Sequence, residues 1–462
     1  MGSEIVLSDV ITDIAAGPFG SNLKVSCFVP SGFPIIDGAN LKGFKVTDNL
    51  TKFVTEEKAR SLSRSIAKRG DVVVTISGTL GQISYIPEDS AYEEYLCSQR
   101  QFKVTFDTSK VYVPYLVFYF HTREGRGKLL AFANQTGVPA LAQPTKNFKR
   151  ITLELPELEQ QRKIALIAEL LTAKIEANAK LNDYLLELTR VLFAHWFKDF
   201  APFQDEETYV TEIGDIPASV KLVPLAELTK VITKGTTPTT LGFEYKESGI
   251  NFIKGESIGD DHSFDYGKFA HIDEEANAAL KRSVIEDRDL LFTIAGTLGR
   301  FAMAEKGMIP ANTNQAVGII RADERLLTPE VLLSYFIGGW QEDYYARRIQ
   351  QAVQANLSLT TLKSLPVPVL EGKKRFEYEE QIIPVIHAIE ANNAENRRLS
   401  ELRDALLPKL MSGEIDVSKI DLTQLNNHLA KSLRQLERYV SPHKNGAART
   451  PASRPVPLAI AS

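Results

Sequence analysis

The stretch TISGTLG at residues 75–81 recurs as TIAGTLG at residues 293–299, 218 positions further along the chain. The same spacing relates Gly17 to Gly235, and a spacing of 216 relates Tyr119–Phe120 to Tyr335–Phe336. A period of this size is far longer than the roughly 20–50 residues of a solenoid unit. The sequence therefore predicts a tandem duplication of a domain-sized module.

Length and composition exclude several classes of protein. With 462 residues, 44% of them hydrophobic and 24% charged, the chain is long enough for about three units and has the composition of a soluble globular protein. Its net charge of −4 argues against a polycation that coats nucleic acid by charge alone. Cys27 and Cys97 are too few for a disulfide framework or a thiolate zinc site. Because no apolar run approaches the ~18 residues that span a bilayer, and no secretion signal opens the chain, we expect a cytoplasmic protein without membrane contact.

Each copy begins with short β-rich segments, such as residues 71–76 and 289–294, continues with helical segments, and passes through a proline-containing exit into a long helical pattern. The predicted fold class is α+β: two mixed α/β domains separated by two long antiparallel helices with pseudo-two-fold symmetry. The predicted order is a first domain (1–156), a long helix (157–200), a solvated linker (201–222), a second domain (223–368), a second long helix (369–412) and a C-terminal extension (413–462), disordered from about residue 441.

Both long helices have apolar heptads. In the first, the a positions are Ile164, Leu171, Leu185 and Leu192, and the d positions are Ile167, Leu181 and Leu188; the second, from about Tyr378 to Leu410, has Ile382, Ile389 and Leu410 at a and Val385, Leu399 and Leu406 at d. Setting Leu171 opposite Leu399 in an antiparallel pair places Asn178 opposite Asn392. We expect this asparagine pair to fix the helix register at some expense of stability. Pro384 falls in the first turn of the second helix as predicted, where a proline ring can shift or kink the start.

Catalytic patterns are missing from the sequence. None of the seven histidines lies in a metal-binding spacing, and neither a Gly-x-Ser-x-Gly elbow nor a Pro-Pro dipeptide occurs, so the amine-methylation motif is absent. The two Gly-Thr-Leu-Gly stretches follow strands and could offer N–H groups to a phosphate, but a tight turn between two strands is the more common role. Neither stretch continues as a P-loop or a dinucleotide fingerprint.

Polar and cationic side chains near these stretches are candidate DNA contacts, because arginine suits guanine edges, asparagine and glutamine suit adenine, and cations suit phosphates. Taken singly, each is more often an ordinary solvated side chain. The candidates are Lys24, Ser77, Thr79, Gln82, Gln99, Arg100, Arg126, Lys128, Lys146 and Lys149 in the first domain, and Lys234, Thr236, Thr297, Arg300, Asn314, Gln315, Arg347 and Arg348 in the second.

The opening of the first long helix, LEQQRKI at residues 158–164, has a counterpart in EEQII at residues 379–383. Together with the Gly-Thr-Leu-Gly stretches and the duplicated layout, these segments resemble the specificity (S) subunit of type I restriction-modification systems, over about residues 5–412. The resemblance implies two target recognition domains, each reading half of a bipartite, asymmetric site in double-stranded DNA. It also implies a non-catalytic chain that binds two methyltransferase (M) subunits and possibly two restriction (R) subunits, which would hold S-adenosylmethionine, ATP and Mg. A base-flipping methyltransferase would then modify adenine.

Under this hypothesis the two helices act as calipers that set the unread spacer between half-sites, and their outward faces contact the methyltransferase. Two other hypotheses stay open. One is a phosphate-ester hydrolase or methyltransferase that uses the Gly-Thr-Leu-Gly loops, and the other is a protein interaction scaffold that never touches DNA.

Overall fold

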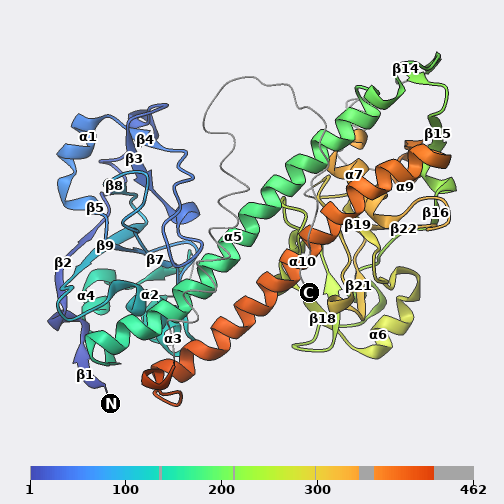
Figure 1. Cartoon of the computed structure of the whole chain (residues 1–462). Helices are drawn as coiled ribbons and strands as arrows, with labels where there is room; N and C mark the ends of the chain where they lie inside the picture. Colours follow the sequence, from blue (N-terminus) through green and yellow to red (C-terminus); the bar gives the residue numbers. More distant parts are fainter. Residues whose placement is uncertain (1, 135–137, 212–213, 297, 343–357, 421–462) are drawn as a thin grey trace. The chain divides into compact units, whose positions relative to one another are not determined.

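The computed structural model describes residues 2–134, 138–211, 214–296, 298–342 and 358–420. The chain divides into two compact units: the first comprises Met1–Ala177 and Arg397–Ser462, and the second comprises Asn178–Asn396. Each unit contains one globule and parts of two long helices, α5 (Leu158–Phe197) and α10 (Gly372–Met411), drawn in green and red in Figure 1. The predicted disorder from about residue 441 lies outside the described residues.

The first globule is built on two small sheets. One has the strand order β2 (Ile11–Ala16), β9 (Gln101–Phe106), β6 (Val72–Thr75), β7 (Ile83–Tyr85), and the other has the order β4 (Phe53–Val54), β3 (Phe33–Ile36), β8 (Glu94–Cys97), β5 (Ile66–Lys68). All neighbours are antiparallel except β3 and β8. The remaining elements are β1 (Ser3–Val6), α1 (Glu56–Ser61), α2 (Val113–His121), α3 (Arg123–Leu130), β10 (Ala133–Asn134), β11 (Ala140–Leu141), α4 (Pro144–Lys149) and β12 (Thr152–Leu155).

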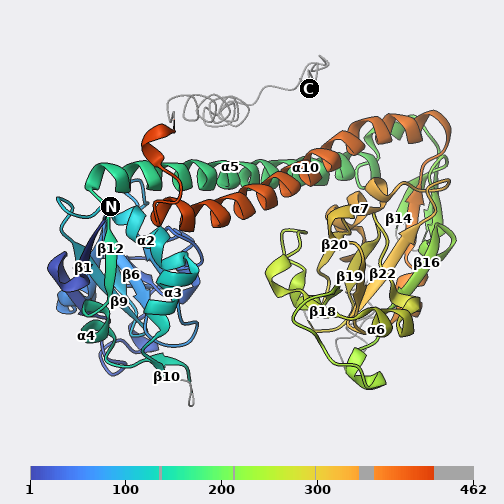
Figure 2. The same cartoon turned by 90° about the horizontal axis from the view of Figure 1, so that it is seen from below.

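The second globule repeats this plan, which confirms the predicted duplication. Its main sheet has the order β16 (Thr229–Lys234), β22 (Val317–Ala322), β19 (Leu290–Thr293), β20 (Phe301–Met303), with α7 (Pro329–Ile337) beside it in Figure 2. The parallel pair recurs as β17 (Ile250–Ile253) and β21 (Ala311–Thr313). The remaining elements are β13 (Thr208–Thr211), β14 (Gly214–Pro217), β15 (Lys221–Pro224), β18 (Ala270–Ile272), α6 (Glu274–Ala279), α9 (Leu359–Lys363) and β23 (Pro366–Val369).

Each globule is closed by a pair of short antiparallel strands. In the first, β1 pairs with β12, so that Ser3 lies opposite Leu155; in the second, β15 pairs with β23, so that Lys221 lies opposite Val369. The chain therefore enters and leaves each globule at neighbouring positions, and the exit strand leads directly into a long helix.

The segment 201–222 is not the solvated linker that its acidic residues and prolines predicted. Phe203, Ile216 and Val220 are buried in the core of the second globule, and β13 and β14 form a hairpin within the segment. The three apolar side chains are widely spaced among polar ones, so the composition of the segment hid the fact that it belongs to a core.

The second long helix begins at Gly372, earlier than the predicted start near Tyr378. Pro384 consequently lies inside the helix instead of in its first turn, which corrects the prediction. A proline there lacks one intrahelical hydrogen bond, yet the helix continues to Met411. Tyr378 and Ile382, just before the proline, are fully buried in the core of the second globule, and this packing holds the segment helical.

The buried face of α5 follows the predicted heptads only in its first half. Ile164 and Leu171 are buried as expected, whereas Leu188 is 42% exposed and Leu186 and Phe193 are buried in its place. A straight helix drifts by about 20° per heptad relative to an ideal heptad repeat. Over three heptads this drift moves the buried stripe toward the neighbouring residue, which the fixed heptad assignment did not allow for.

The long helices of the second unit share a layer of asparagines, but the predicted pairing is wrong. Asn178 donates to Asn396 (2.9 Å), while Asn392 donates to Asn182 (2.8 Å) and Asn182 donates to Asn393 (2.7 Å). We call these five residues the asparagine layer. The helices run antiparallel, as expected, but the partner of Asn178 lies four residues further along α10 than Asn392, or about 6 Å at 1.5 Å per residue.

Candidate nucleic-acid interface

The two Gly-Thr-Leu-Gly stretches are hairpin turns, each linking two adjacent strands. Gly78 and Gly81 have φ of 96° and 87°, and Gly296 and Gly299 have φ of 77° and 91°, a conformation that favours glycine. The N–H of Gly78 donates to Pro139 (3.0 Å), and the N–H of Gly299 donates to Thr293 (3.0 Å). These donors serve the fold, which weakens the interpretation of the turns as phosphate-binding loops.

A glycine directly follows the first strand of each main sheet, and the same steric constraint explains both glycines. A Cβ at Gly17 would overlap the carbonyl oxygen of Ser98, and a Cβ at Gly235 would overlap that of Thr313. The N–H of Gly17 also donates to Gln101 (2.7 Å). The loop after β2 is thereby held close to the start of β9.

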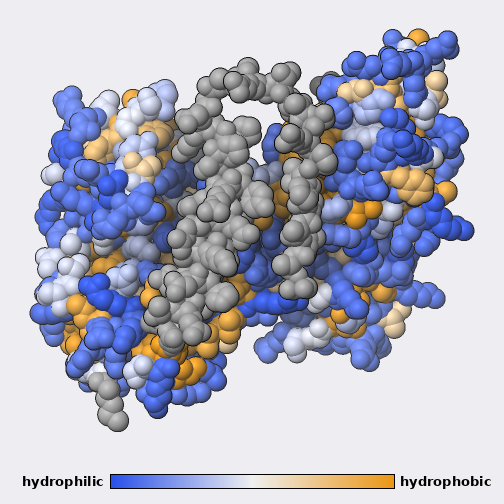
Figure 3. Space-filling view, in the orientation of Figure 1, coloured by the Kyte–Doolittle hydropathy of each residue, from blue (hydrophilic) through white to orange (hydrophobic). Residues whose placement is uncertain are grey.

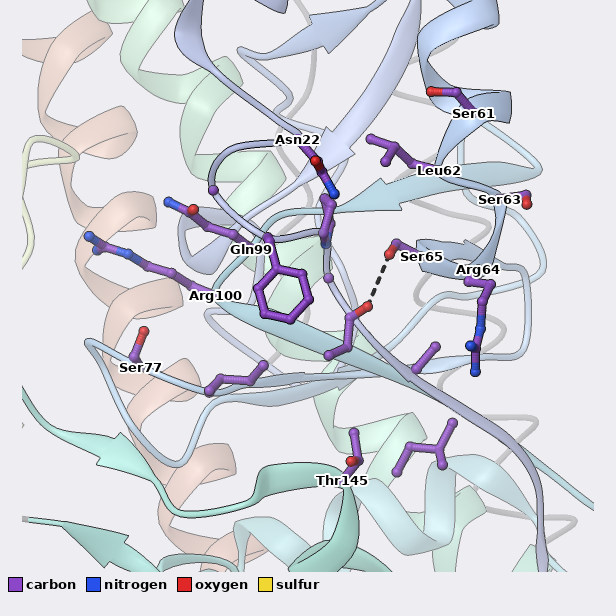
Figure 4. A pocket seen from close by; sticks show the side chains of 18 residues that line it. Asn22, Ser61, Leu62, Ser63, Arg64, Ser65, Ser77, Gln99, Arg100 and Thr145 are labelled. Carbon is purple, nitrogen blue, oxygen red and sulfur yellow. Dashed lines mark hydrogen bonds between the residues drawn. The ribbon is translucent and has the colours of Figure 1, made fainter.

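This close approach shapes a pocket of about 840 Å³ in the first globule. Its walls come from the end of β2 and the following loop, from Ser61–Ser65, from Ile76–Ser77 and from Gln99–Arg100 (Figure 4). Arg64 lies on one side of the pocket and Arg100 on the other, with the Ser65 hydroxyl donating to Ala16 (3.0 Å) between them. Among the described residues that line the pocket, none is an aspartate or a glutamate.

The structure brings only some of the predicted contacts of the first globule to this pocket. Ser77, Gln99 and Arg100 line it. The Arg126 guanidinium lies against Gly81 in the adjacent turn, where Thr79 is exposed. The exposed lysines Lys24, Lys146 and Lys149 lie outside the pocket wall.

Two further candidates of the first globule have structural partners. Gln82 accepts a hydrogen bond from Thr75 (2.9 Å) and donates to Gly38 (2.9 Å), so both ends of its amide serve the fold. Lys128 pairs with Glu124 (2.9 Å) and lies over the ring of Tyr119.

One residue of the pocket wall that sequence reasoning missed is Arg64. Its signal was available, because Arg64-Ser65 recurs as Arg282-Ser283 at the same spacing of 218 that relates the turns. Ser65 and Ser283 are both buried, whereas Arg64 and Arg282 are exposed beside them. Applying the repeat spacing to every arginine would have found the pair.

In the second globule the predicted contacts are mostly engaged within the fold. Arg300 pairs with Asp260 (2.6 Å) and donates to the carbonyl of Ile258 (3.2 Å). The Asn314 side chain accepts from the N–H of Ala316 (3.0 Å). The remaining candidates are Gln315, which accepts from Thr237, the exposed Lys234, the half-buried Thr236, and Thr297, Arg347 and Arg348, which lie outside the described residues.

Two buried titratable groups of the first globule have shifted pKa values. Burial raises the pKa of the Cys97 thiol to about 12, so it stays protonated at neutral pH. Burial also raises the pKa of the Asp71 carboxyl, which accepts from Thr105 (2.6 Å) and from the N–H of Lys68 (2.9 Å). Among the described residues, no group of three or more histidine, cysteine, aspartate or glutamate side chains is placed to hold a metal ion.

The surface of each globule is mainly polar. On the face shown in Figure 3, hydrophilic residues predominate on each globule, with small apolar areas among them. In the described part of the chain, no helix combines the length and apolar character needed to cross a bilayer.

Comparison with known proteins shows what the chain is similar to. Residues 30–187 match the type I restriction modification DNA specificity domain. The MjaIX specificity subunit of Methanocaldococcus jannaschii is 22% identical over 79% of this chain and 82% of its own length. The HindI specificity subunit of Haemophilus influenzae is 21% identical over 76% of this chain and 88% of its own length.

The solved structures that resemble the chain include an S subunit from M. genitalium, with 15% identity, 89% of this chain and 96% of that chain covered, and a TM-score of 0.47. An HsdS subunit from Thermoanaerobacter tengcongensis shares 16% identity, with 89% and 97% covered and a TM-score of 0.33.

The structure holds two copies of one α/β globule, each leading into a long helix, and the match to the DNA specificity domain falls on the first globule and the first part of α5. Over three quarters or more of its length, the chain is therefore similar to the specificity subunits of type I restriction enzymes.

Proposed function

We propose that the chain is the sequence-specific DNA-binding subunit of a type I restriction-modification complex and reads a bipartite, asymmetric site, one half with each globule. The observation that carries the proposal is the pocket of the first globule, where two arginines and several hydroxyl and amide groups gather without a carboxylate. Arginines contact phosphates and guanine edges, and the polar groups suit the other base edges. The divergence of the two globules at equivalent positions supports an asymmetric site.

The test measures binding of duplex DNA by the full chain in complex with its methyltransferase, after mapping methylated adenines in the host genome to define the site. Replacing Arg64 and Arg100 together by alanine should weaken binding and, if both contact phosphates, reduce the slope of log affinity against log salt by about 2. Arg60→Ala is the matched control, because Arg60 is in the same globule but pairs with Glu94 (2.6 Å) outside the pocket wall. An unchanged affinity and slope in the double variant would contradict the proposal for this pocket.

The bond-making chemistry would belong to partner subunits. We expect S-adenosylmethionine to bind to two methyltransferase subunits, and ATP and Mg to bind to two restriction subunits where these are present. The proposal for this chain is recognition alone: purified without partners, it should neither methylate nor cleave DNA. Methyl transfer by the isolated chain would favour the enzyme hypothesis instead.

We propose that the methyltransferase binds the second half of α5. Tyr184, Leu188 and Val191 are 44%, 42% and 56% exposed, and their spacing of four and three residues places them on one helix face. An apolar stripe on a helix fits an apolar helix face of a partner. Leu188→Glu should reduce co-purification of the methyltransferase, whereas Val210→Glu, at an exposed position on β13, should not. Equal recovery with both variants would place the partner elsewhere.

A further inference from the structure

Among the large apolar side chains that line the pocket of the first globule, Phe19 is the most exposed. It is 83% exposed, although burying a phenylalanine normally contributes to stability. It belongs to the loop after β2 and lines the pocket together with Arg64 and Arg100. An exposed aromatic ring in the wall of a pocket that also contains two arginines needs a reason outside the folding of the globule.

The loop presents this ring on a fixed backbone. Gly17 is held against the Ser98 carbonyl and donates its N–H to Gln101 (2.7 Å), while the N–H of Asn22 donates to the carbonyl of Phe19 itself (2.8 Å). Pro18, between the glycine and the aromatic residue, restricts the backbone further. Because the loop is ordered before any partner arrives, little conformational entropy is lost when the ring makes its contact.

The surroundings of the ring select the chemistry of the partner. A partner that meets an apolar ring and two guanidinium groups, but no carboxylate, must present apolar faces beside anionic groups. Duplex DNA does so wherever an apolar side chain separates two stacked bases between their phosphates, and phenylalanine is one of the residues that serve as such wedges. A lysine-rich protein surface would lack a carboxylate in the pocket wall to pair with, because the nearby Asp13 already pairs with Lys103 (2.9 Å).

The second globule lacks the feature. The residue 218 positions after Phe19 is Thr237, whose hydroxyl donates to the side chain of Gln315. The strands that carry the two loops are equivalent, so the difference lies in the loop residue and not in the scaffold. Any contact made by Phe19 therefore has no aromatic counterpart at this position of the second globule.

We infer that Phe19 is a wedge that unstacks one base step in the half-site read by the first globule, and that the other half-site is read without this distortion. The inference rests on the proposed function. Pyrimidine–purine steps unstack most readily, so part of the specificity of the first globule comes from the deformability of that step and not from hydrogen bonds to its bases.

The experiment uses the full chain assembled with its methyltransferase and duplexes carrying 2-aminopurine at successive positions of both half-sites, because the fluorescence of this base rises when it unstacks. Apart from the adenine positions that the methyltransferase flips out, we expect a rise at one step in one half-site only. Phe19→Ala and Phe19→Thr should abolish the rise and weaken binding by about fivefold or more. Phe19→Leu should keep most of it, because leucine also serves as a wedge. Val210→Ala is the control, since Val210 is 85% exposed but lies on β13.

The outcomes separate the two levels of the proposal. Specific binding with no fluorescence rise outside the flipped adenines, or with such a rise that Phe19→Ala leaves unchanged, would overturn the wedge and leave the proposed function standing. A Phe19→Ala variant that loses the methyltransferase but not DNA would also overturn the wedge, by placing the ring in a protein interface. Absence of specific DNA binding by the wild-type complex would overturn the proposed function, and the wedge with it.

Discussion

Replacing Asn182 by alanine tests whether the asparagine layer stabilises the second unit. Asn182 donates to Asn393 (2.7 Å) and accepts from Asn392 (2.8 Å), so the substitution removes two hydrogen bonds. At about 1 kcal/mol each, the loss is about 2 kcal/mol. For a unit of this size it should lower the temperature of the corresponding unfolding transition by about 4–8 °C.

The measurement is differential scanning calorimetry of the full chain. Asn393→Ala removes only one of the two bonds and should give about half of the shift. Asp183→Ala, at the exposed position next to Asn182, is the control for the change in helix propensity. If Asn182→Ala shifts the transition no more than Asp183→Ala does, the hydrogen bonds of the layer do not stabilise the unit.

Cross-linking tests the register of the same layer. In a Cys27→Ser background, cysteines at positions 182 and 392 should form a disulfide. Cysteines at 178 and 392 should not, because the four-residue offset adds about 6 Å along the helices and exceeds the Cα separation a disulfide spans. The reverse result would restore the register that the heptads predicted.

Three other substitutions probe the packing. Gly17→Ala should destabilise the first unit by more than about 2 kcal/mol in urea unfolding, since the new Cβ would overlap the Ser98 carbonyl; a midpoint unchanged from wild type would rule this clash out. Arg321→Met leaves the buried Asp289 carboxylate without the two 2.7 Å hydrogen bonds that it accepts from Arg321, so it should lower the unfolding free energy in urea by about 3–5 kcal/mol. An unchanged unfolding free energy would show that water replaces the guanidinium. Burial lowers the pKa of His121 below its ordinary 6.5, so the stability it contributes is present above about pH 6.5 and is lost as the pH falls through the folded-state pKa. His121→Gln should flatten that acid-side decline in urea midpoints between pH 7.5 and 5, and an identical decline would show that other groups cause it.

The duplication could be predicted because the repeat spacing survives in the residues that the backbone requires. Gly17 and Gly235 permit the same close approach of two backbone segments, and the turn glycines adopt the same left-handed conformation in both copies. Substitution at such positions strains the backbone, so they record the duplication even where other residues have diverged.

The long helices were harder to predict in detail. Their existence follows from their length and apolar periodicity, but their register depends on which of several asparagines meet, and Asn182 and Asn396 had no role in the prediction. The prediction that the two helices set the spacer between half-sites stays a prediction.

The candidate site was only partly predictable. Arg100 and Gln99 were found because they are cationic or polar and close to a turn in sequence, yet by the same criterion Gln82 and Arg300 were included, although both serve the fold. Residue type alone cannot separate a side chain that faces solvent from one whose partners lie far away in the sequence. Phe19 was missed because an isolated phenylalanine in a sequence is normally part of a core.

The short strand pairs β1–β12 and β15–β23 suggest how such a chain could acquire new targets. Each globule begins and ends at residues that are neighbours in space, so it is a module bounded by one strand pair with four paired residues on each strand. A globule from another protein with matching boundary strands could replace either globule while the long helices kept their sequence. Recombination at the boundary strands could therefore change the DNA sequence that the protein reads in a single step.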